Sequence, residues 1–231
     1  MIHSFKCKNF YSFKDEATVD FIVDKNAPNN NSYAVSKSGT RVSLIEAVIG
    51  PNASGKTNLL KPLPILKWLI VDSWNLNPTA GLPVKSFIAQ TSKTTPTELS
   101  VVFDIDNITY EYEVKLTEIQ ILYERLTKRS KSKQRVTQKT LLLREFDEKT
   151  NNYKVDFKGF GAPAGFSKLL RNNATAISTA LRLNHPLSSR IAEYWQNVDS
   201  NVSELGHIGD QMFGLQTSTG AAMQQIGRAH V

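Results

Sequence analysis

Gly50-Pro51-Asn52-Ala53-Ser54-Gly55-Lys56-Thr57 is an uninterrupted G-x-x-x-x-G-K-T sequence, the pattern of a phosphate-binding loop. Its two glycines allow successive backbone N–H groups to point inward, where they can surround phosphate oxygens at the start of a helix. The spacing predicts that Lys56 reaches the β- and γ-phosphates of a nucleotide and that Thr57 ligates the Mg²⁺ ion that bridges them. The stretch therefore indicates a strand, a phosphate-binding loop and a helix in succession.

The residues on either side of the loop predict that strand and that helix. Residues 42–49 form a near-continuous apolar run, which is typical of a strand buried on both faces. Residues 58–70 place apolar side chains at helical spacing, but Pro62 and Pro64 interrupt them. Because proline removes a helical hydrogen bond and clashes with the preceding turn, we expect a kink or break near Lys61.

Length and composition limit the class of protein. The 231 residues suffice for one sizeable α/β domain, or for one domain with a subdomain. No run of about 18 apolar residues is present, so we expect no membrane-spanning helix, and we see no secretory signal. Cys7 is the single cysteine, and the four histidines lack the spacing of metal ligands. These features predict a cytoplasmic protein without an internal disulfide.

Periodicity predicts antiparallel strands between the helix of the phosphate-binding loop and a later group of helices. Residues 2–23 alternate around a polar turn and predict a β-hairpin beside the phosphate-loop strand. Residues 99–105 and 108–114 alternate around Asp106-Asn107 and predict a second hairpin. Further strands are expected at 119–126, 139–145 and 153–157, helices at 164–183 and 186–198, and loops at 28–39 and 206–220.

Basic residues concentrate in one segment. Between Val114 and Arg144 nine basic residues stand against two acidic ones, which accounts for the whole net charge of +7. Such a segment can contact DNA or another polyanion. Because no aromatic residue between Arg125 and Lys139 could stack on a base, a solvated hairpin tip is the favoured interpretation. The basic residues are Lys115, Arg125, Lys128, Arg129, Lys131, Lys133, Arg135, Lys139 and Arg144.

Several stretches together resemble one group of ATPases. Lys8-Asn9-Phe10-Tyr11-Ser12-Phe13 lies in the first hairpin, and the phosphate-binding loop continues as Asn58-Leu59-Leu60. Residues 110–114 and 176–186 add to this likeness. The chain is similar to the ABC-type ATP-binding heads of the OLD, RecF and SMC-like group, including bacterial OLD-like ATPases. The resemblance implies an α/β P-loop NTPase core, ABC-ATPase-like, with an antiparallel β subdomain and following helices.

The resemblance also implies a site made of two segments. Asn52 would approach the γ-phosphate of ATP, Lys56 would stabilise phosphate charge and Thr57 would bind Mg²⁺. The first hairpin would lie against adenine and ribose, with Tyr11 standing where related heads often carry arginine. The implied nucleotide-binding residues are Tyr11, Ser12, Phe13, Gly50, Pro51, Asn52, Ala53, Ser54, Gly55, Lys56, Thr57 and Asn58.

A complete head of this group would hydrolyse ATP as a head-to-head homodimer and act in DNA-related processes or phage defence. Such heads add a Ser-Gly-rich signature segment, a Walker B strand and a switch histidine, which we do not find. We therefore expect residues 1–224 to be the N-terminal part of a truncated head. Its expected parts are 1–72 with the hairpin, phosphate-loop strand and first helix, 97–158 with the strand block, and 164–198 with the helices.

The last seven residues suggest why the chain would be truncated. Gln225–Val231 fits the translation of CAG ATC GGA AGA GCA CAC GTC, which looks like a common sequencing-adapter string. We expect this tail to be artefactual and the natural protein to continue differently. An in-frame stop codon directly after Val231 in genomic DNA would contradict that expectation.

Two other functions stay open. A small P-loop kinase would use residues 101–104, ending in Asp104, as its Walker B strand and Arg125, Arg129 and Arg135 as lid residues. The strict alternation of that strand favours a hairpin instead. A non-enzymatic, nucleotide-dependent module would dock a partner on the strand block. A GTPase is disfavoured because the Asn-Lys-x-Asp segment that reads guanine is missing.

Overall fold

A seven-stranded antiparallel sheet organises the part of the chain that the computed structural model describes, residues 1–28, 30–87, 95–131, 136–200 and 202. The expected loop at 206–220 and the tail at 225–231 lie outside these residues. The strand order is β2-β1-β5-β6-β7-β8-β9. The strands are β1 (Ile2–Lys8), β2 (Ala17–Asp20), β5 (Thr97–Ile105), β6 (Ile108–Leu116), β7 (Ile121–Lys131), β8 (Val136–Asp147) and β9 (Asn152–Asp156).

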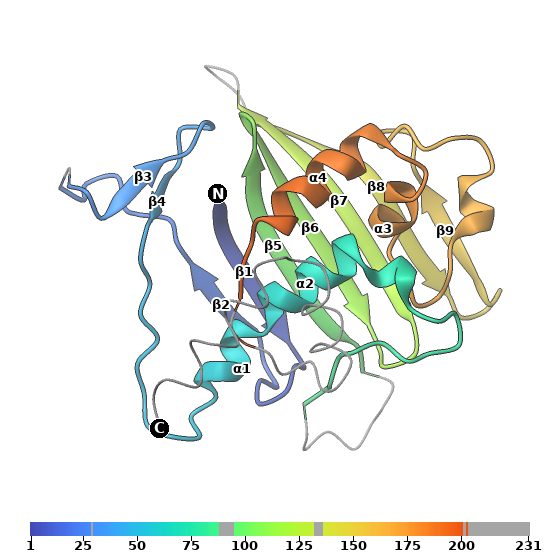
Figure 1. Ribbon diagram of the computed structural model, residues 1–231, viewed down its shortest axis with the longest axis horizontal. Helices are drawn as coiled ribbons and strands as arrows, with labels where there is room; N and C mark the ends of the chain where they lie inside the picture. Colours follow the sequence, from blue (N-terminus) through green and yellow to red (C-terminus); the bar gives the residue numbers. More distant parts are fainter. Residues whose placement is uncertain (29, 88–94, 132–135, 201, 203–231) are drawn as a thin grey trace, which may run out of the picture.

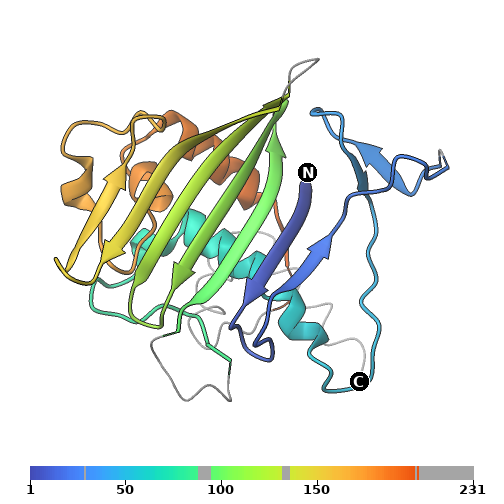
Figure 2. The same ribbon diagram turned by 180° about the vertical axis from the view of Figure 1, so that it is seen from behind.

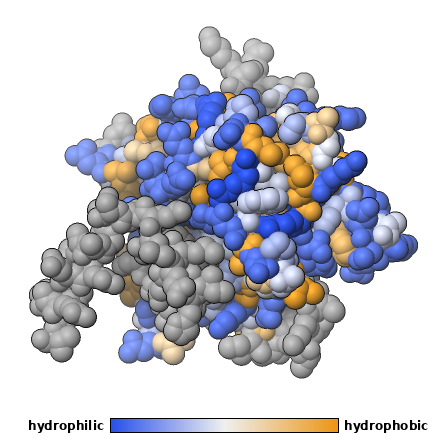
Figure 3. Space-filling model, turned by 45° about the vertical axis from the view of Figure 1, so that its right-hand side comes forward, coloured by the Kyte–Doolittle hydropathy of each residue, from blue (hydrophilic) through white to orange (hydrophobic). Residues whose placement is uncertain are grey.

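Helices cover one face of this sheet and leave the other face bare among the described residues (Figures 1 and 2). They are α2 (Pro62–Val71), α3 (Ala176–Leu181) and α4 (Pro186–Gln196), with short 3₁₀ turns η1 (Ser73–Asn75) and η2 (Phe166–Leu169). Figure 3 shows a part of the surface on which small apolar patches are interrupted by hydrophilic residues.

The predicted hairpin around Asp106-Asn107 is confirmed as β5 and β6, whose register pairs Val101 with Tyr112 and Phe103 with Tyr110. Because successive residues of a strand point to opposite faces, these four side chains share the covered face. All four are buried, and Phe103 also packs against the ring of Trp195 in α4. The two-residue period of the sequence therefore identifies the sheet side of the core.

The predicted break near Lys61 is also confirmed. Helix α1 (Lys56–Leu60) ends at Lys61, and α2 begins at Pro62. Pro62 and Pro64 have no N–H to donate to the carbonyls one turn earlier, so the hydrogen-bond ladder is interrupted there. The chain nonetheless keeps helical backbone angles at Lys61, and α2 follows α1 closely along the lower part of the sheet (Figure 1).

The predicted strand over 42–49 is wrong beyond Ser43. Only β4 (Arg41–Ser43) is a strand, and it pairs with β3 (Tyr33–Val35) in a separate two-stranded sheet. Residues 44–49 run to the phosphate-binding loop outside both sheets (Figures 1 and 2), and Ile45 and Ile49 are 81% and 92% exposed. A strand requires partners for its backbone groups and apolar cover for its faces. Among the described residues only Leu44 and Ile45 of this run have backbone hydrogen bonds, with Ser32 and Ser43, and nothing covers the side chains of Ile45 and Ile49. The first hairpin therefore does not lie beside a phosphate-loop strand.

A single helix over 164–183 is also wrong, because the carbonyls it would need have other partners. The Arg144 guanidinium donates hydrogen bonds to the carbonyls of Arg171 and Ala174, at 2.6 and 2.9 Å. The Asn173 amide donates to the carbonyls of Asn77 and Ala80. These contacts hold 170–174 in an irregular conformation, and α3 starts only after Thr175, whose hydroxyl caps it. The helix expected at 186–198 is confirmed as α4.

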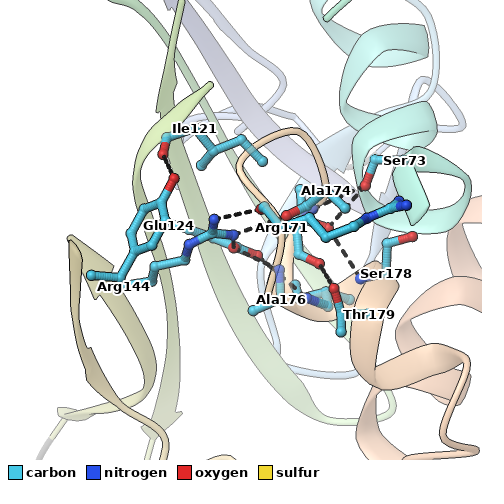
Figure 4. A network of polar contacts seen from close by, with 12 residues as sticks. Ser73, Ile121, Glu124, Arg144, Arg171, Ala174, Ala176, Ser178 and Thr179 are labelled. Carbon is cyan, nitrogen blue, oxygen red and sulfur yellow. Dashed lines mark hydrogen bonds and ion pairs between the residues drawn. The ribbon is translucent and has the colours of Figure 1, made fainter. Parts of the chain in front are cut away.

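A buried carboxylate joins the sheet to α3 (Figure 4). Glu124 in β7 is 0% exposed, and its oxygens accept hydrogen bonds from the backbone N–H groups of Ala176 and Ile177. The Tyr112 hydroxyl donates to the same carboxylate, and the fully buried Arg144 guanidinium lies 3.8 Å away. Burial raises the pKa of Glu124, while the positive charge of Arg144 opposes that shift.

Replacing Arg144 by alanine should strongly destabilise the fold. The change leaves the Glu124 charge buried without its cation and leaves two carbonyls of 170–174 without donors. We expect the free energy of unfolding in urea to fall by roughly 3–5 kcal/mol. The control is Arg125→Ala, which breaks a partly exposed pair with Glu113 and should cost less than about 1 kcal/mol. Equal losses in the two variants would contradict the structural role of Arg144.

His185 should make the fold less stable in mild acid. Its Nδ1 accepts the hydrogen bond that caps α4 from the backbone N–H of Ser188, while Nε2–H donates to the carbonyl of Phe160 at 2.9 Å. Burial lowers the pKa of His185, so the folded protein favours the neutral ring. The unfolded chain therefore binds more protons below its pKa of about 6.5, and stability is lost as the pH falls through that value.

The measurement compares unfolding free energies of wild type and His185→Asn between pH 7.5 and pH 5. Asparagine keeps a capping acceptor but does not titrate. Wild type should lose stability relative to the variant as the pH falls. Parallel curves would show that protonation of His185 does not contribute.

Candidate functional site

The phosphate-binding loop adopts the backbone conformation of an anion-binding nest. Ala53 and Gly55 have φ angles of 63° and 90°, which lie in the left-handed region. Alternation between right- and left-handed conformations turns successive N–H groups toward one point. A left-handed alanine is uncommon and costs about 1 kcal/mol or more. The loop therefore carries local strain of the kind that concentrates at binding sites.

A side chain at either glycine of the motif would force a neighbouring serine hydroxyl to move. A β-carbon on Gly50 would come within 2.9 Å of the Ser54 hydroxyl oxygen, and one on Gly55 within 2.8 Å of the Ser12 hydroxyl oxygen. Real β-carbons essentially never approach so closely. Gly50 thus lies close to Ser54 of the same loop, and Gly55 lies close to Ser12 of the first hairpin.

Lys56 spans the loop. Its ammonium donates hydrogen bonds to the carbonyls of Gly50 and Pro51, at 2.7 and 2.6 Å. An ammonium has three N–H donors, so one remains for a ligand. The side chains of Asn52 and Thr57 are exposed beside it. The side chains of Asn52 and Thr57, which the motif predicts as phosphate and Mg²⁺ contacts, are therefore accessible to a ligand.

The first hairpin contacts this loop and the start of α1. Asn58, the third residue of α1, donates its amide to the Ser12 hydroxyl at 3.1 Å. The Phe13 ring lies next to Gly55, and the Tyr11 ring holds the Lys61 ammonium 4.1 Å from its centre. The structure thus brings 11–13 and 50–58 together, although nearly forty residues separate them. No sequence pattern predicted that Asn58 and Lys61 contact the hairpin.

The base of the hairpin turn is firmly held. Asn9 is buried, and its side-chain amide bonds to the carbonyls of Thr95 and Pro96 and accepts from the N–H of Phe87. The hydroxyl of Thr97, the first residue of β5, donates to the Asn9 carbonyl. The central sheet therefore fixes the position from which the turn approaches the phosphate-binding loop.

Asp104, the Walker B residue of the kinase alternative, lies far from this site. Phe103 pairs with Ile2 at one end of β1, whereas Glu98 pairs with Lys8 at the other end, from which the turn continues to Ser12. At about 3.3 Å per residue, β1 separates its ends by roughly 20 Å. Burial raises the pKa of Asp104, but the close contact with His3 and the hydrogen bond from Ser38 outweigh burial and lower the pKa overall. This carboxylate is held by structural contacts, not by the phosphate-binding loop.

The basic segment divides into paired and unpaired cations. Arg125 and Arg129 in β7 form ion pairs with Glu113 and Glu111 on the bare face of the sheet, and Lys115 pairs with Glu98. Arg144 is buried in the core. Lys128 and Lys139 lie directly opposite each other in the register of β7 and β8. Residues 132–135, with two further basic residues, lie outside the described part of the chain.

The other titratable groups of the described residues are not grouped into a further site. Within the described residues, no three His, Cys, Asp or Glu side chains are grouped as metal ligands. Burial raises the pKa of the Cys7 thiol to about 12, so it stays protonated and unreactive. No helix among the described residues is long and apolar enough to cross a membrane.

Gly55→Ala should destabilise the protein more than Gly165→Ala. Both glycines have left-handed backbone, with φ of 90° and 79°, so both alanines pay about 1–2 kcal/mol. Only the alanine at 55 also meets a neighbour, because nothing lies within 4 Å of a β-carbon at Gly165. Urea unfolding of both variants checks this. Equal losses would mean that Ser12 does not pack against Gly55.

A protein-family model matches the larger part of the chain. Residues 45–212 match the family model described as "AAA domain, putative AbiEii toxin, Type IV TA system". The matched range starts just before the phosphate-binding loop and continues past α4. No curated protein matches the chain.

Proposed function

Because the chain belongs to this family of AAA-domain proteins, we propose that it binds ATP with Mg²⁺ at residues 50–58 and that its complete form is an ATP hydrolase. Family membership supports a nucleotide-binding, ATPase-like function. The observation that carries the proposal is the nest at Ala53–Gly55, with the Lys56 ammonium directly beside it.

The residues of the loop fit the charge and shape of a triphosphate. Backbone N–H groups of the loop would surround the phosphates, and the Lys56 ammonium would donate its remaining N–H to them and neutralise part of their charge. Thr57 would hold Mg²⁺, which when bound draws negative charge away from the β- and γ-phosphates. The contacts of Lys56 with Gly50 and Pro51 keep its ammonium beside the loop before any ligand arrives.

We also propose that the exposed run before the loop is covered in the assembled enzyme. This run directly precedes the proposed nucleotide site in the sequence, and its exposed apolar residues are Leu44, Ile45, Val48 and Ile49. An apolar run of this kind suits a strand with cover on both faces. Further strands of a complete ATPase head would provide that cover and could bring the Walker B and signature residues. Head-to-head dimerisation and membership of the OLD, RecF and SMC-like group are part of this proposal.

A role in DNA-related processes or phage defence rests on the resemblance of the motifs alone. The ion pairs of Arg125 and Arg129 within the sheet reduce the basic surface that DNA could contact. The kinase alternative loses support because Asp104 lies in an antiparallel hairpin remote from the loop. A nucleotide-dependent binding module remains the second candidate, since the hydrogen bonds that Lys56 and Asn58 make go to carbonyls and to Ser12 and not to a carboxylate or histidine that could act as general base.

Lys56→Ala should weaken binding of Mg·ATP at least tenfold, about 1.4 kcal/mol, because it removes a charge-assisted contact with phosphate. Titration calorimetry on the full chain measures the dissociation constant, and phosphate release is assayed in the same sample. The control is Lys149→Ala, an exposed lysine in the turn between β8 and β9. Unchanged affinity in the Lys56 variant would place the nucleotide elsewhere.

Binding without phosphate release would support an ATPase head that needs further residues for catalysis. Turnover by this chain that disappears in Asp104→Asn would instead support the kinase-like alternative. A partner that binds wild type and Lys56→Ala equally would favour a module that does not depend on nucleotide.

A further inference from the structure

The turn that contacts the phosphate-binding loop is short and strained. Phe10 and Phe13 exchange two backbone hydrogen bonds of 2.8 Å, so Tyr11 and Ser12 alone form the bend. Tyr11 has φ of 48°, a conformation that glycine adopts far more readily than tyrosine. Its N–H also donates to the carbonyl of Lys85 at 3.0 Å. The surrounding chain therefore holds Tyr11 in a conformation that the residue itself disfavours.

This bend directs Ser12 at the phosphate end of the site. The Ser12 oxygen rests against Gly55, the N-cap of α1, and accepts the amide hydrogen bond of Asn58 two residues after Lys56. Both contacts lie at the junction between the loop and α1, where the motif predicts Mg²⁺ and the outer phosphates. A contact with adenine or ribose, as the resemblance implies, would call for Ser12 to face away from this junction.

The Ser12 hydroxyl keeps a donor for a ligand. A hydroxyl has one O–H donor and can accept two hydrogen bonds. Asn58 uses one accepting position, and no acceptor for the Ser12 proton is present among the described residues. The side chain is exposed, so the Ser12 hydroxyl could donate a hydrogen bond to a phosphate oxygen in the nest.

We propose that Ser12 is a positioning residue for the phosphates, held by Asn58 and set in place by the strained turn at Tyr11. This inference rests on the proposed nucleotide function. It assigns the first hairpin to the phosphate end of the site, and it makes the side chains of Ser12 and Asn58 a coupled pair.

The test uses two ligands, Mg·ATP and Mg·tripolyphosphate, which share the phosphate chain but not the nucleoside. Titration calorimetry is done on the full chain with Ser12→Ala, Asn58→Ala and the double variant. Ser12→Ala should weaken both ligands by roughly threefold to tenfold, the effect of one hydrogen bond. Asn58→Ala should have a similar effect, and the double variant should bind no worse than about the weaker single variant, because the two act as a unit.

The control is Ser4→Ala, in which a serine of β1 on the bare face is lost; its affinities should equal those of wild type. Thermal unfolding of each variant confirms that the fold is retained. A loss confined to ATP would overturn the inference in favour of a base or ribose contact. Unchanged affinities for both ligands, or fully additive losses in the double variant, would also overturn it.

Failure of the proposed function gives a different result. If wild type binds neither ligand, or if Lys56→Ala binds ATP as wild type does, the nucleotide assignment itself is wrong. If Lys56→Ala weakens ATP while Ser12→Ala leaves both ligands unaffected, the nucleotide assignment stands and only the role of Ser12 is lost.

Discussion

The buried contact between Glu124 and the first N–H groups of α3 determines how the helices sit on the sheet. A carboxylate without water requires donors for its oxygens, and the structure supplies them from Ala176, Ile177 and Tyr112. Arg144 brings the compensating charge, and its two terminal nitrogens donate to carbonyls of the chain that leads into α3. The same network therefore fixes a strand, a loop and a helix, and it leaves little freedom in their relative positions.

On the opposite face of the sheet, glutamates and basic residues also form pairs, but these pairs are partly exposed to solvent. Glutamates of β5 and β6 stand beside cations of β6 and β7, so Glu98, Glu111 and Glu113 each have a partner. Such cross-strand pairs contribute little stability in water, but they keep an open sheet face polar and locally neutral. Three cations of the segment that is strongly basic in the sequence, Lys115, Arg125 and Arg129, are thus paired with glutamates on this face.

Sequence patterns predicted those parts of the fold whose partners are local. The β5–β6 hairpin, the break at Lys61 and α4 follow from alternation, proline chemistry and helical spacing within a few residues. The errors arose where a distant residue decides the outcome. Arg144 donates hydrogen bonds to the carbonyls of Arg171 and Ala174, and no pattern within residues 170–174 indicates that contact. The run at 44–49 has the composition of a buried strand, but composition cannot show which chain covers it. At the site, the loop was predictable, whereas the contact of Ser12 with Asn58 depends on the fold.

The candidate site consists of the phosphate-binding loop and the turn of the first hairpin. Both contain residues with strained backbone, but only the turn is anchored to the central sheet. Tyr11, Ala53 and Gly55 all have positive φ, and each strained non-glycine residue costs of order 1–3 kcal/mol. The loop is exposed and cannot hold such a conformation through its own burial. The turn can, because Asn9 and Thr97 anchor it to the central sheet. Through Ser12 the turn passes part of that rigidity to the loop. A loop arranged in advance has less conformational entropy to lose when a ligand binds. Under the proposed function, the sheet would therefore raise the affinity for phosphates although it lies away from them.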